Sequence, residues 1–319
     1  MTPEFNLIAK YFTRPVTRAI LGVGDDCALI RLAPGCELAI STDTLVSGTH
    51  FFADADPGKL GHKALAVNLS DLAAMGAAPR YATLALTLPA VDDAWLDAFS
   101  RGLFKLAEAS GIELIGGDTT RGPLAMTLTV FGEVAAGKAL RRDGAQAGDD
   151  IWVSGSLGGA ALALKHLQGA AALKPVVLAR ALERLLEPLP RNALGCALLE
   201  AAHSAIDVSD GLIADLTHIC ERSELAAEVE WPAVPLSPTL LSVGPEWRIP
   251  CGLAGGDDYE LCFTAGENRR GDIEAIAATT GVALTRIGTM RSGAPRVTVR
   301  DERGAPMTIA AAGFDHFSS

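Results

Sequence analysis

The chain has 319 residues, of which 49% are hydrophobic and 20% are charged, and its net charge is −11 at pH 7. This length exceeds what one hydrophobic core usually supports, so we expect two domains. The acidic balance argues against a nucleic-acid partner, and no apolar run reaches the roughly 18 residues that a membrane span needs.

Cellular location is predicted from the amino terminus and the cysteines. Residues 1–10 lack the apolar core of a signal peptide. The chain has six cysteines, and none shows the spacing of a zinc site or of a C-x-x-C pair. We therefore expect a cytoplasmic protein with free thiols.

A glycine turn with two acids follows an expected amphipathic helix over residues 5–12. The stretch 22–24 matches the start of the dinucleotide-binding pattern G-x-G-x-x-G, but Cys27 stands where the third glycine should be. Residues 28–32 are predicted to form a strand, whereas that pattern requires a helix. We therefore reject dinucleotide binding and retain two adjacent carboxylates, Asp25 and Asp26.

The next predicted strand, over residues 37–42, brings oxygen-bearing side chains to its end. These side chains are Ser41, Thr42 and Asp43. His50 follows in a glycine-containing loop, where a lone histidine is more often a surface residue than a ligand.

An almost wholly apolar helix is predicted over residues 61–75, ending before Gly76. Asn68 and Asp71 interrupt it and lie three residues apart, which places them on one face. A buried carboxylate is costly unless it is paired or bound to a metal. We therefore favour Asp71 as a metal ligand over a local hydrogen bond to Asn68 or the backbone.

The stretch 115–123, Ile-Gly-Gly-Asp-Thr-Thr-Arg-Gly-Pro, is the central motif of the chain. It lies between strands predicted over 81–88 and 124–131, and it follows a helix that Gly111 ends. The glycine pair predicts a tight turn, and Asp118 with the following threonines and arginine offers metal ligands and phosphate donors. Alone, the stretch is equally compatible with a turn that caps local backbone groups.

The second half repeats this chemistry after a charged, glycine-containing boundary, which predicts domains over residues 1–137 and 148–319. A strand over 204–207 ends in Asp207, and Ser209 and Asp210 precede a helix that starts at Gly211. Residues 231–250 are proline-rich and expected to be loop. The acidic stretch 255–260 leads into a strand over 261–263.

Acids at glycine turns and strand ends thus recur in both halves of the chain. If the fold brings them together, they repel strongly unless divalent cations screen them. That combination suits magnesium-nucleotide chemistry, in which a protein acts by positioning and charge neutralisation. The sequence has no P-loop, H-E-x-x-H, G-x-S-x-G or kinase catalytic-loop pattern.

Several stretches, in order along nearly the whole chain, resemble the thiamine-monophosphate kinase family of the aminoimidazole-ribonucleotide synthetase-like superfamily. They are residues 22–28, 41–46, 66–76, 116–122, 206–212, 255–261 and 313–317. The resemblance implies a two-domain α/β (α+β) fold. The amino-terminal domain would bind ATP and magnesium and dimerise through its strands, and the carboxy-terminal domain would close the active-site cleft.

The resemblance also implies the ligands of the site residues. The implied Mg²⁺ ligands are Asp26, Asp43, Asp71, Asp118, Asp207 and Asp210, supported by Ser41 and Thr42. The implied ATP contacts are Gly117, Asp118, Arg142 and Ser209. The implied contacts to thiamine monophosphate are His50, Asp257 and Phe314. The family commonly has glutamate where this chain has Asp257, so the reach of this side chain is one methylene shorter.

The activity that the resemblance implies is in-line transfer of the ATP γ-phosphoryl group to thiamine monophosphate in a cytoplasmic homodimer. The acceptor oxygen is already anionic, so no covalent nucleophile or general base is required. One alternative is another ATP-using member of the superfamily, such as aminoimidazole-ribonucleotide or selenophosphate synthetase. Residues 1–10 lack the reactive cysteine of the latter. A second alternative is a non-catalytic protein that binds metal or nucleotide.

Overall fold

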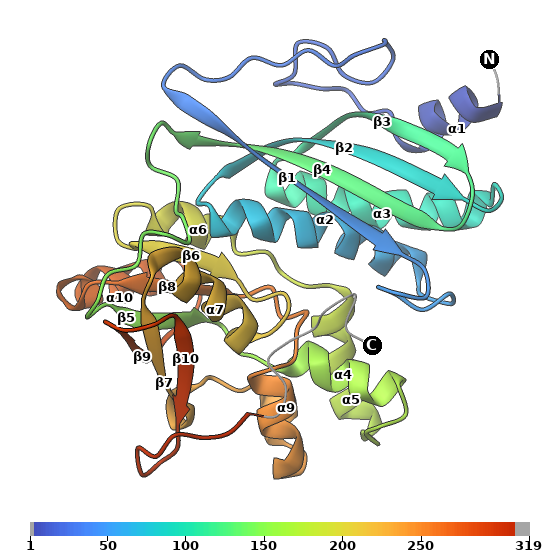
Figure 1. Ribbon diagram of the computed structural model, residues 1–319. Coiled ribbons are helices and arrows are strands. Elements are labelled where there is room, and N and C mark those ends of the chain that lie inside the picture. The colour runs from blue at the N-terminus through green and yellow to red at the C-terminus, as the bar shows by residue number, and fades with distance from the viewer. Residues whose placement is uncertain (1–2, 310–319) are drawn as a thin grey trace. The chain divides into compact units, whose positions relative to one another are not determined.

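The computed structural model describes residues 3–309, which divide into two compact units. Unit 1 comprises Met1–Leu72 and Ala77–Lys138, and unit 2 comprises Ala73–Gly76 and Ala139–Ser319. Each unit contains one β-sheet with helices packed on it (Figure 1). Phe314 lies outside the described residues.

Unit 1 is built on a four-stranded sheet in the order β1-β4-β2-β3. The strands are β1 (Cys36–Val46), β2 (Ala78–Leu88), β3 (Glu113–Arg121) and β4 (Ala125–Ala135). β4 pairs antiparallel with β1 and β2, whereas β2 and β3 are parallel. The helices are α1 (Pro3–Tyr11), α2 (Pro57–Ala74) and α3 (Asp93–Ser110). Figure 1 shows α2 and α3 along one face of the sheet, and we call the opposite face the outer face.

The α2 and α3 helices approach closely because both carry glycine at their contact. A Cβ atom at Gly61 would overlap the Phe99 carbonyl oxygen, and one at Gly102 would overlap that of Gly58. Asp92 caps the α3 amino terminus. Gly111 ends this helix in the left-handed conformation, as the sequence predicted. This packing buries the apolar length of α2 and holds its few polar side chains in place.

Three sequence expectations for unit 1 are wrong. Residues 28–32 form no strand, because their β pairing is limited to a single isolated bridge between Leu29 and Leu21. The strand predicted over 37–42 continues to Val46, so Asp43 lies inside it and not at its end. The central Gly-Gly-Asp motif is not a turn but part of β3, whose pairing with β2 shifts register between Ala82 and Thr83.

Unit 2 contains a six-stranded sheet in the order β10-β7-β9-β5-β8-β6. The strands are β5 (Asp150–Ser154), β6 (Ser204–Asp207), β7 (Ala226–Glu230), β8 (Leu261–Ala265), β9 (Leu284–Arg291) and β10 (Arg296–Arg300). The helices are α4 (Gly159–Leu167), α5 (Pro175–Leu186), α6 (Asn192–Leu198), α7 (Leu212–Ser223), α8 (Pro238–Leu241), α9 (Arg248–Gly252) and α10 (Arg270–Thr280). The proline-rich stretch 231–250 is therefore not all loop. Prolines start several of its helical turns, where their fixed φ is favourable.

Two apolar clusters fill the two faces of this sheet. Leu212 and Leu216 of α7 pack with one set of strand residues, which includes Cys262. Leu198 of α6 packs with Phe263 in the other set. Because Cys262 and Phe263 are adjacent in β8, these clusters lie on opposite faces of the sheet. The carboxyl end of β6, where the candidate acids lie, is thus held on both sides.

Candidate functional site

Four polar residues meet where β1 passes α2 in unit 1. Ser41 Oγ lies 2.5 Å from Asp71 Oδ2. The Asp43 N–H donates to Asn68 Oδ1 at 3.0 Å, and Asn68 Nδ2 donates to the Ala64 carbonyl at 3.0 Å. Asn68 thus satisfies a backbone donor of an edge strand, and a hydroxyl orients the Asp71 carboxyl. Asp71 therefore meets Ser41, and Asn68 meets the backbone of Asp43.

The sheet register separates this group from two other candidates in unit 1. Successive strand residues face opposite sides, so Thr42 lies on the side opposite to Ser41 and Asp43. Thr42 Oγ1 is 2.9 Å from Thr129 Oγ1 on the outer face. Asp118 lies on that face as well. Asp118 aligns with Ala85, Ala85 aligns with Thr127, and Thr127 aligns with Thr44, which is on the same face of β1 as Thr42. The structure therefore brings Ser41, Asp43 and Asp71 together but places Thr42 and Asp118 across the sheet from them.

Gly117 is required for the backbone path that presents Asp118. Its φ is 148°, a backbone conformation that residues other than glycine rarely adopt. A Cβ atom here would overlap the Leu84 carbonyl oxygen of β2. Gly117 thus permits the close pairing of β3 with β2, and the exposed Asp118 follows it in the strand.

His50 and Asp26 lie in the loops of unit 1. His50 Nδ1 accepts the Val46 N–H at 3.0 Å, so the neutral ring carries its proton on Nε2. The ring is half-buried and fixed to the end of β1. Asp26 is exposed on its turn, and its N–H donates to Asp25 Oδ1 at 2.9 Å.

In unit 2, the loop after β6 is organised by a residue that the sequence analysis missed, Asp215 of α7. Its Oδ2 atom accepts the N–H groups of Ser209, Asp210 and Gly211 at 3.0, 3.1 and 3.1 Å. Burial, together with the nearby charge of Asp210, raises the pKa of Asp215 to about 6. The sequence signal was a carboxylate on the buried face of α7, beside Leu212 and Leu216.

A second loop lies against the first through two backbone hydrogen bonds. The Asp257 N–H donates to the Ser209 carbonyl at 2.8 Å, and the Tyr259 N–H donates to the Val208 carbonyl at 2.9 Å. A Cβ atom at Gly256 would overlap the Ser209 carbonyl oxygen. Asp257 and Tyr259 have φ values of 66° and 50°, which are uncommon for residues with side chains. This contact places three predicted residues, Ser209, Asp210 and Asp257, in one region of unit 2.

The remaining acids of the Gly-Gly-Asp-Asp-Tyr-Glu stretch have structural partners. Asp258 Oδ2 accepts the Gly158 N–H at 2.7 Å, and burial raises the pKa of Asp258 to about 8. Glu260 is 1% exposed and binds Arg184 and Arg191 at 2.7 and 2.6 Å. These contacts tie β8 to α4, α5 and the start of α6.

The predicted ATP contact Arg142 is exposed in the segment that precedes β5. Its carbonyl accepts a hydrogen bond from Ser223 Oγ at 2.8 Å. Arg141, by contrast, pairs with Asp143 at 2.6 Å. The two adjacent arginines therefore differ in their side-chain contacts, because Arg141 forms an ion pair with an acid of the same segment.

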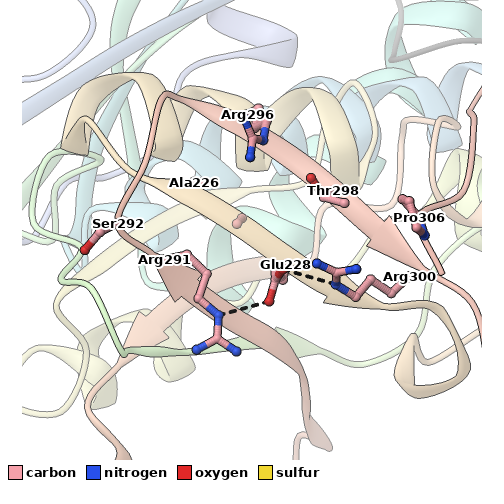
Figure 2. Close-up of a pocket in the computed structure, with 9 residues that line it drawn as sticks. Ala226, Glu228, Arg291, Ser292, Arg296, Thr298, Arg300 and Pro306 are labelled. Atoms are coloured by element: carbon pink, nitrogen blue, oxygen red, sulfur yellow. Dashed lines mark hydrogen bonds and ion pairs between the residues drawn. The ribbon is translucent and has the colours of Figure 1, made fainter. Parts of the chain in front are cut away.

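A cavity of about 270 Å³ lies on unit 2 where β7, β9 and β10 meet, and none of the predicted site residues lines it. Figure 2 shows Arg291 and Arg300 directed toward Glu228. Arg291 Nε lies 3.0 Å and Arg300 Nε 3.1 Å from the Glu228 carboxylate. The Glu228 carboxylate thus pairs with both arginines, and this ion-pair cluster lines the cavity.

The chemistry of the candidate acids fits magnesium, because all of them offer carboxylate oxygens and Ser41 and Thr42 add hydroxyls. These residues do not form one group: Asp43 and Asp71 lie on one side of the unit 1 sheet, Asp118 lies on the other, and Asp207 and Asp210 belong to unit 2. Within residues 3–309, no three His, Cys, Asp or Glu side chains form a group that could hold a metal ion. No helix in the same range is long and apolar enough to cross a membrane.

Comparisons with known proteins match nearly the whole chain. The family AIR synthase related protein matches with its N-terminal domain over residues 24–134 and its C-terminal domain over residues 146–300. The thiamine-monophosphate kinase of Escherichia coli K12 is 49% identical over 322 residues, covering 99% of this chain and 98% of that protein.

Solved structures agree with this assignment. The thiamine-monophosphate kinase of Stenotrophomonas maltophilia K279a superposes with a TM-score of 0.84 at 47% identity, covering 92% of this chain and 94% of that one. AaThiL complexed with AMPPCP and TMP gives a TM-score of 0.78 at 28% identity, covering 90% and 89%. The predicted resemblance and fold class are thus confirmed. The chain belongs to the AIR synthase related protein family and, within it, to the thiamine-monophosphate kinases.

Proposed function

We propose that this protein transfers the γ-phosphoryl group of ATP to thiamine monophosphate, giving thiamine diphosphate and ADP. The observation that carries this proposal is the 49% identity to a thiamine-monophosphate kinase over 99% of the chain. The structure of AaThiL complexed with AMPPCP and TMP supports the same pair of substrates.

The chemistry asks the protein to bring two polyanions together in line. The acceptor phosphate is already anionic near neutral pH, so the reaction needs no covalent nucleophile and no general base. Bound Mg²⁺ supplies charge neutralisation between the two phosphates. The protein's own part is to hold its carboxylates and hydroxyls in position, as the contacts of Asp71 with Ser41 and of Asp215 with the 209–211 loop do.

We assign the site residues as follows. The magnesium ligands are Asp26, Ser41, Thr42, Asp43, Asp71, Asp118, Asp207 and Asp210. The ATP contacts are Gly117, Asp118, Arg142 and Ser209. The thiamine monophosphate contacts are His50, Asp257 and Phe314. Three observations support the roles of Arg142, His50 and Asp257: Arg142 is exposed, neutral His50 carries its proton on Nε2, and Asp257 has a fixed backbone.

Phe314 is proposed as an aromatic surface for the cationic thiazolium ring of the substrate. A cation over an aromatic face gains roughly 0.5–2 kcal/mol, depending on desolvation. Replacement by leucine retains apolar bulk but removes the π face, so Phe314→Leu distinguishes a cation–π contact from simple packing.

We also propose that the protein is a cytoplasmic homodimer. Residues 1–137 would form the ATP- and Mg-binding and dimerisation domain, and residues 148–319 the second α/β domain, which supplies further site residues. The outer face of the unit 1 sheet carries the 58% exposed Ile40 and supports dimerisation through these strands. The six cysteines, all within the described range, form no disulfide, which favours a reducing compartment.

The direct test measures ADP and thiamine diphosphate formation by the purified protein with ATP and magnesium. Equal amounts of both products, formed only when thiamine monophosphate is added, are expected. ATP turnover with another acceptor in place of thiamine monophosphate would point to a different ATP-using member of the superfamily. Binding of ATP without any turnover would point to a non-catalytic protein.

A further inference from the structure

We propose that Asp215 is a positioning residue, whose carboxylate holds the backbone of residues 209–211 in the shape that the magnesium site needs. The inference rests on the proposed function, and in particular on the roles given to Asp207, Ser209 and Asp210. No motif pointed to Asp215. Its role follows from the hydrogen bonds that it accepts.

The geometry is that of one oxygen receiving successive backbone donors. Asp215 Oδ2 accepts three consecutive N–H groups, those of residues 209, 210 and 211, at 3.0, 3.1 and 3.1 Å. A carboxylate is a stronger acceptor for such an array than a neutral group. Asp215 is 3% exposed and lies in α7, whose neighbouring Leu212 and Leu216 are buried in the core of unit 2. The acceptor is therefore rigidly anchored.

The same loop is held from its other side by the segment 254–259. The Ser209 carbonyl accepts the Asp257 N–H, and the Val208 carbonyl accepts the Tyr259 N–H. Gly211 has a φ of 127°, and a Cβ atom there would overlap the backbone of Ala254. The loop is thus clamped between α7 and this segment, and Asp215 supplies the α7 side of the clamp.

The electrostatic environment of Asp215 indicates that its carboxylate does not serve the stability of the fold alone. Asp215 lies close enough to Asp210 for the two charges to disfavour each other, and burial adds a desolvation cost. The three N–H donors offset this cost only while the loop keeps its observed shape. The arrangement therefore couples the α7 carboxylate to the placement of Asp210.

The test replaces Asp215 by asparagine, which keeps the size and one carbonyl acceptor but removes the charge. We expect the Mg²⁺ concentration for half-maximal rate to rise roughly tenfold, because bonds to a charged acceptor are stronger than bonds to a neutral one. The amide proton resonances of residues 209–211 should move upfield in the same variant without ligands.

The matched control is Asp150→Asn. Asp150 is 2% exposed in the same unit and pairs with Arg270 and Arg286, away from the loop. This variant should lower the thermal unfolding midpoint and leave the Mg²⁺ requirement unchanged. An equal rise in both variants would mean that Asp215 is merely structural, and would overturn the inference.

Two further variants decide the remaining cases. Asp215→Glu keeps the charge but moves it by one methylene, so a positioning role predicts a raised Mg²⁺ requirement here too, even if Asp215→Asn does not fold. A wild-type requirement in Asp215→Glu would overturn the inference. Asp210→Asn serves as the reference for the proposed ligand. If the Mg²⁺ requirement rises in Asp210→Asn but not in Asp215→Asn, only the positioning role is overturned. If it rises in neither variant, both the positioning role and the assignment of Asp210 as a ligand are overturned.

Discussion

At the scale of single residues, neighbouring acids in one motif have different environments. Asp257 is half-buried on a strained backbone, whereas the next residue, Asp258, is 3% exposed and held by a backbone N–H of Gly158. Burial raises the pKa of Asp258 to about 8, so this carboxyl is neutral in the folded protein over most of the physiological range.

The raised pKa of Asp258 predicts a pH-dependent stability. A carboxyl whose pKa is higher in the folded than in the unfolded protein stabilises the fold most at low pH, and this contribution is lost as pH rises from about 4 toward 8. Asp258→Asn cannot ionise and should lose less stability over that range. Between pH 5 and pH 8, we expect the unfolding free energy of the wild-type protein to fall by at least about 1.4 kcal/mol relative to that of Asp258→Asn. Urea unfolding at each pH measures it, and parallel curves would contradict the assignment.

Asp118 tests the metal role of a single exposed acid. Asp118→Asn is nearly isosteric, so we expect an unchanged thermal midpoint, a fall in rate of roughly a hundredfold, and partial recovery at high magnesium concentration. Asp97→Asn, which alters another exposed acid of unit 1, should keep normal kinetics. Near-normal turnover of Asp118→Asn at ordinary magnesium concentrations would remove Asp118 from the metal site.

At the scale of elements, glycines decide how closely helices and strands approach. Gly61 and Gly102 allow α2 and α3 to touch through backbone atoms, and Gly117 does the same for β2 and β3. These contacts leave no space for a Cβ atom. The positions of Asp71 on α2 and Asp118 on β3 therefore depend on glycines that carry no chemistry themselves.

Gly117 and Gly116 offer a matched pair of variants that tests how far glycine controls the close approach of β2 and β3. Gly117→Ala combines an unfavourable φ of 148° with overlap on Leu84, so we expect a loss of roughly 2–4 kcal/mol in stability. A Cβ atom at Gly116 would lie 3.8 Å from a Thr83 methyl carbon, an ordinary contact, and Gly116→Ala should cost much less. Thermal unfolding of both variants measures the difference. Equal midpoints would show that the strand adapts.

At the scale of the whole molecule, the outer face of the unit 1 sheet is the expected dimer interface. Ile40 is 58% exposed and precedes Thr42 by one strand repeat, so both side chains lie on this face. An apolar side chain so exposed on the sheet face opposite to α2 and α3 is well suited to burial against a second copy.

Dimerisation can be tested with one charge on this face. We expect the wild-type protein to sediment as a dimer and Ile40→Asp as a folded monomer, because an unpaired charge buried in an interface costs several kcal/mol. Val176 on α5 is 69% exposed in unit 2, and Val176→Asp should remain dimeric. A wild-type monomer, or a dimeric Ile40→Asp, would rule out this interface.

The sequence by itself determined the family and the elements with local signals. Helix α3 was predicted with its Gly111 end, and α2 was predicted from its apolar run. These features depend on neighbours within a few residues, so the chain order contains them. The motifs that carry the family resemblance are likewise short runs of adjacent residues. The roles of the individual site residues remain predictions.

Only the tertiary structure decided which candidates meet. Strand length and register depend on partner strands far away in the sequence, so Gly117 and Asp118 were expected in a turn and lie in β3. The same dependence placed Thr42 and Asp118 on one face of the sheet and Asp71 beyond the other. The roles of Asp215 and Glu260 were decided by the tertiary structure, because the role of a buried carboxylate depends on its partners, and those partners lie on other elements or loops.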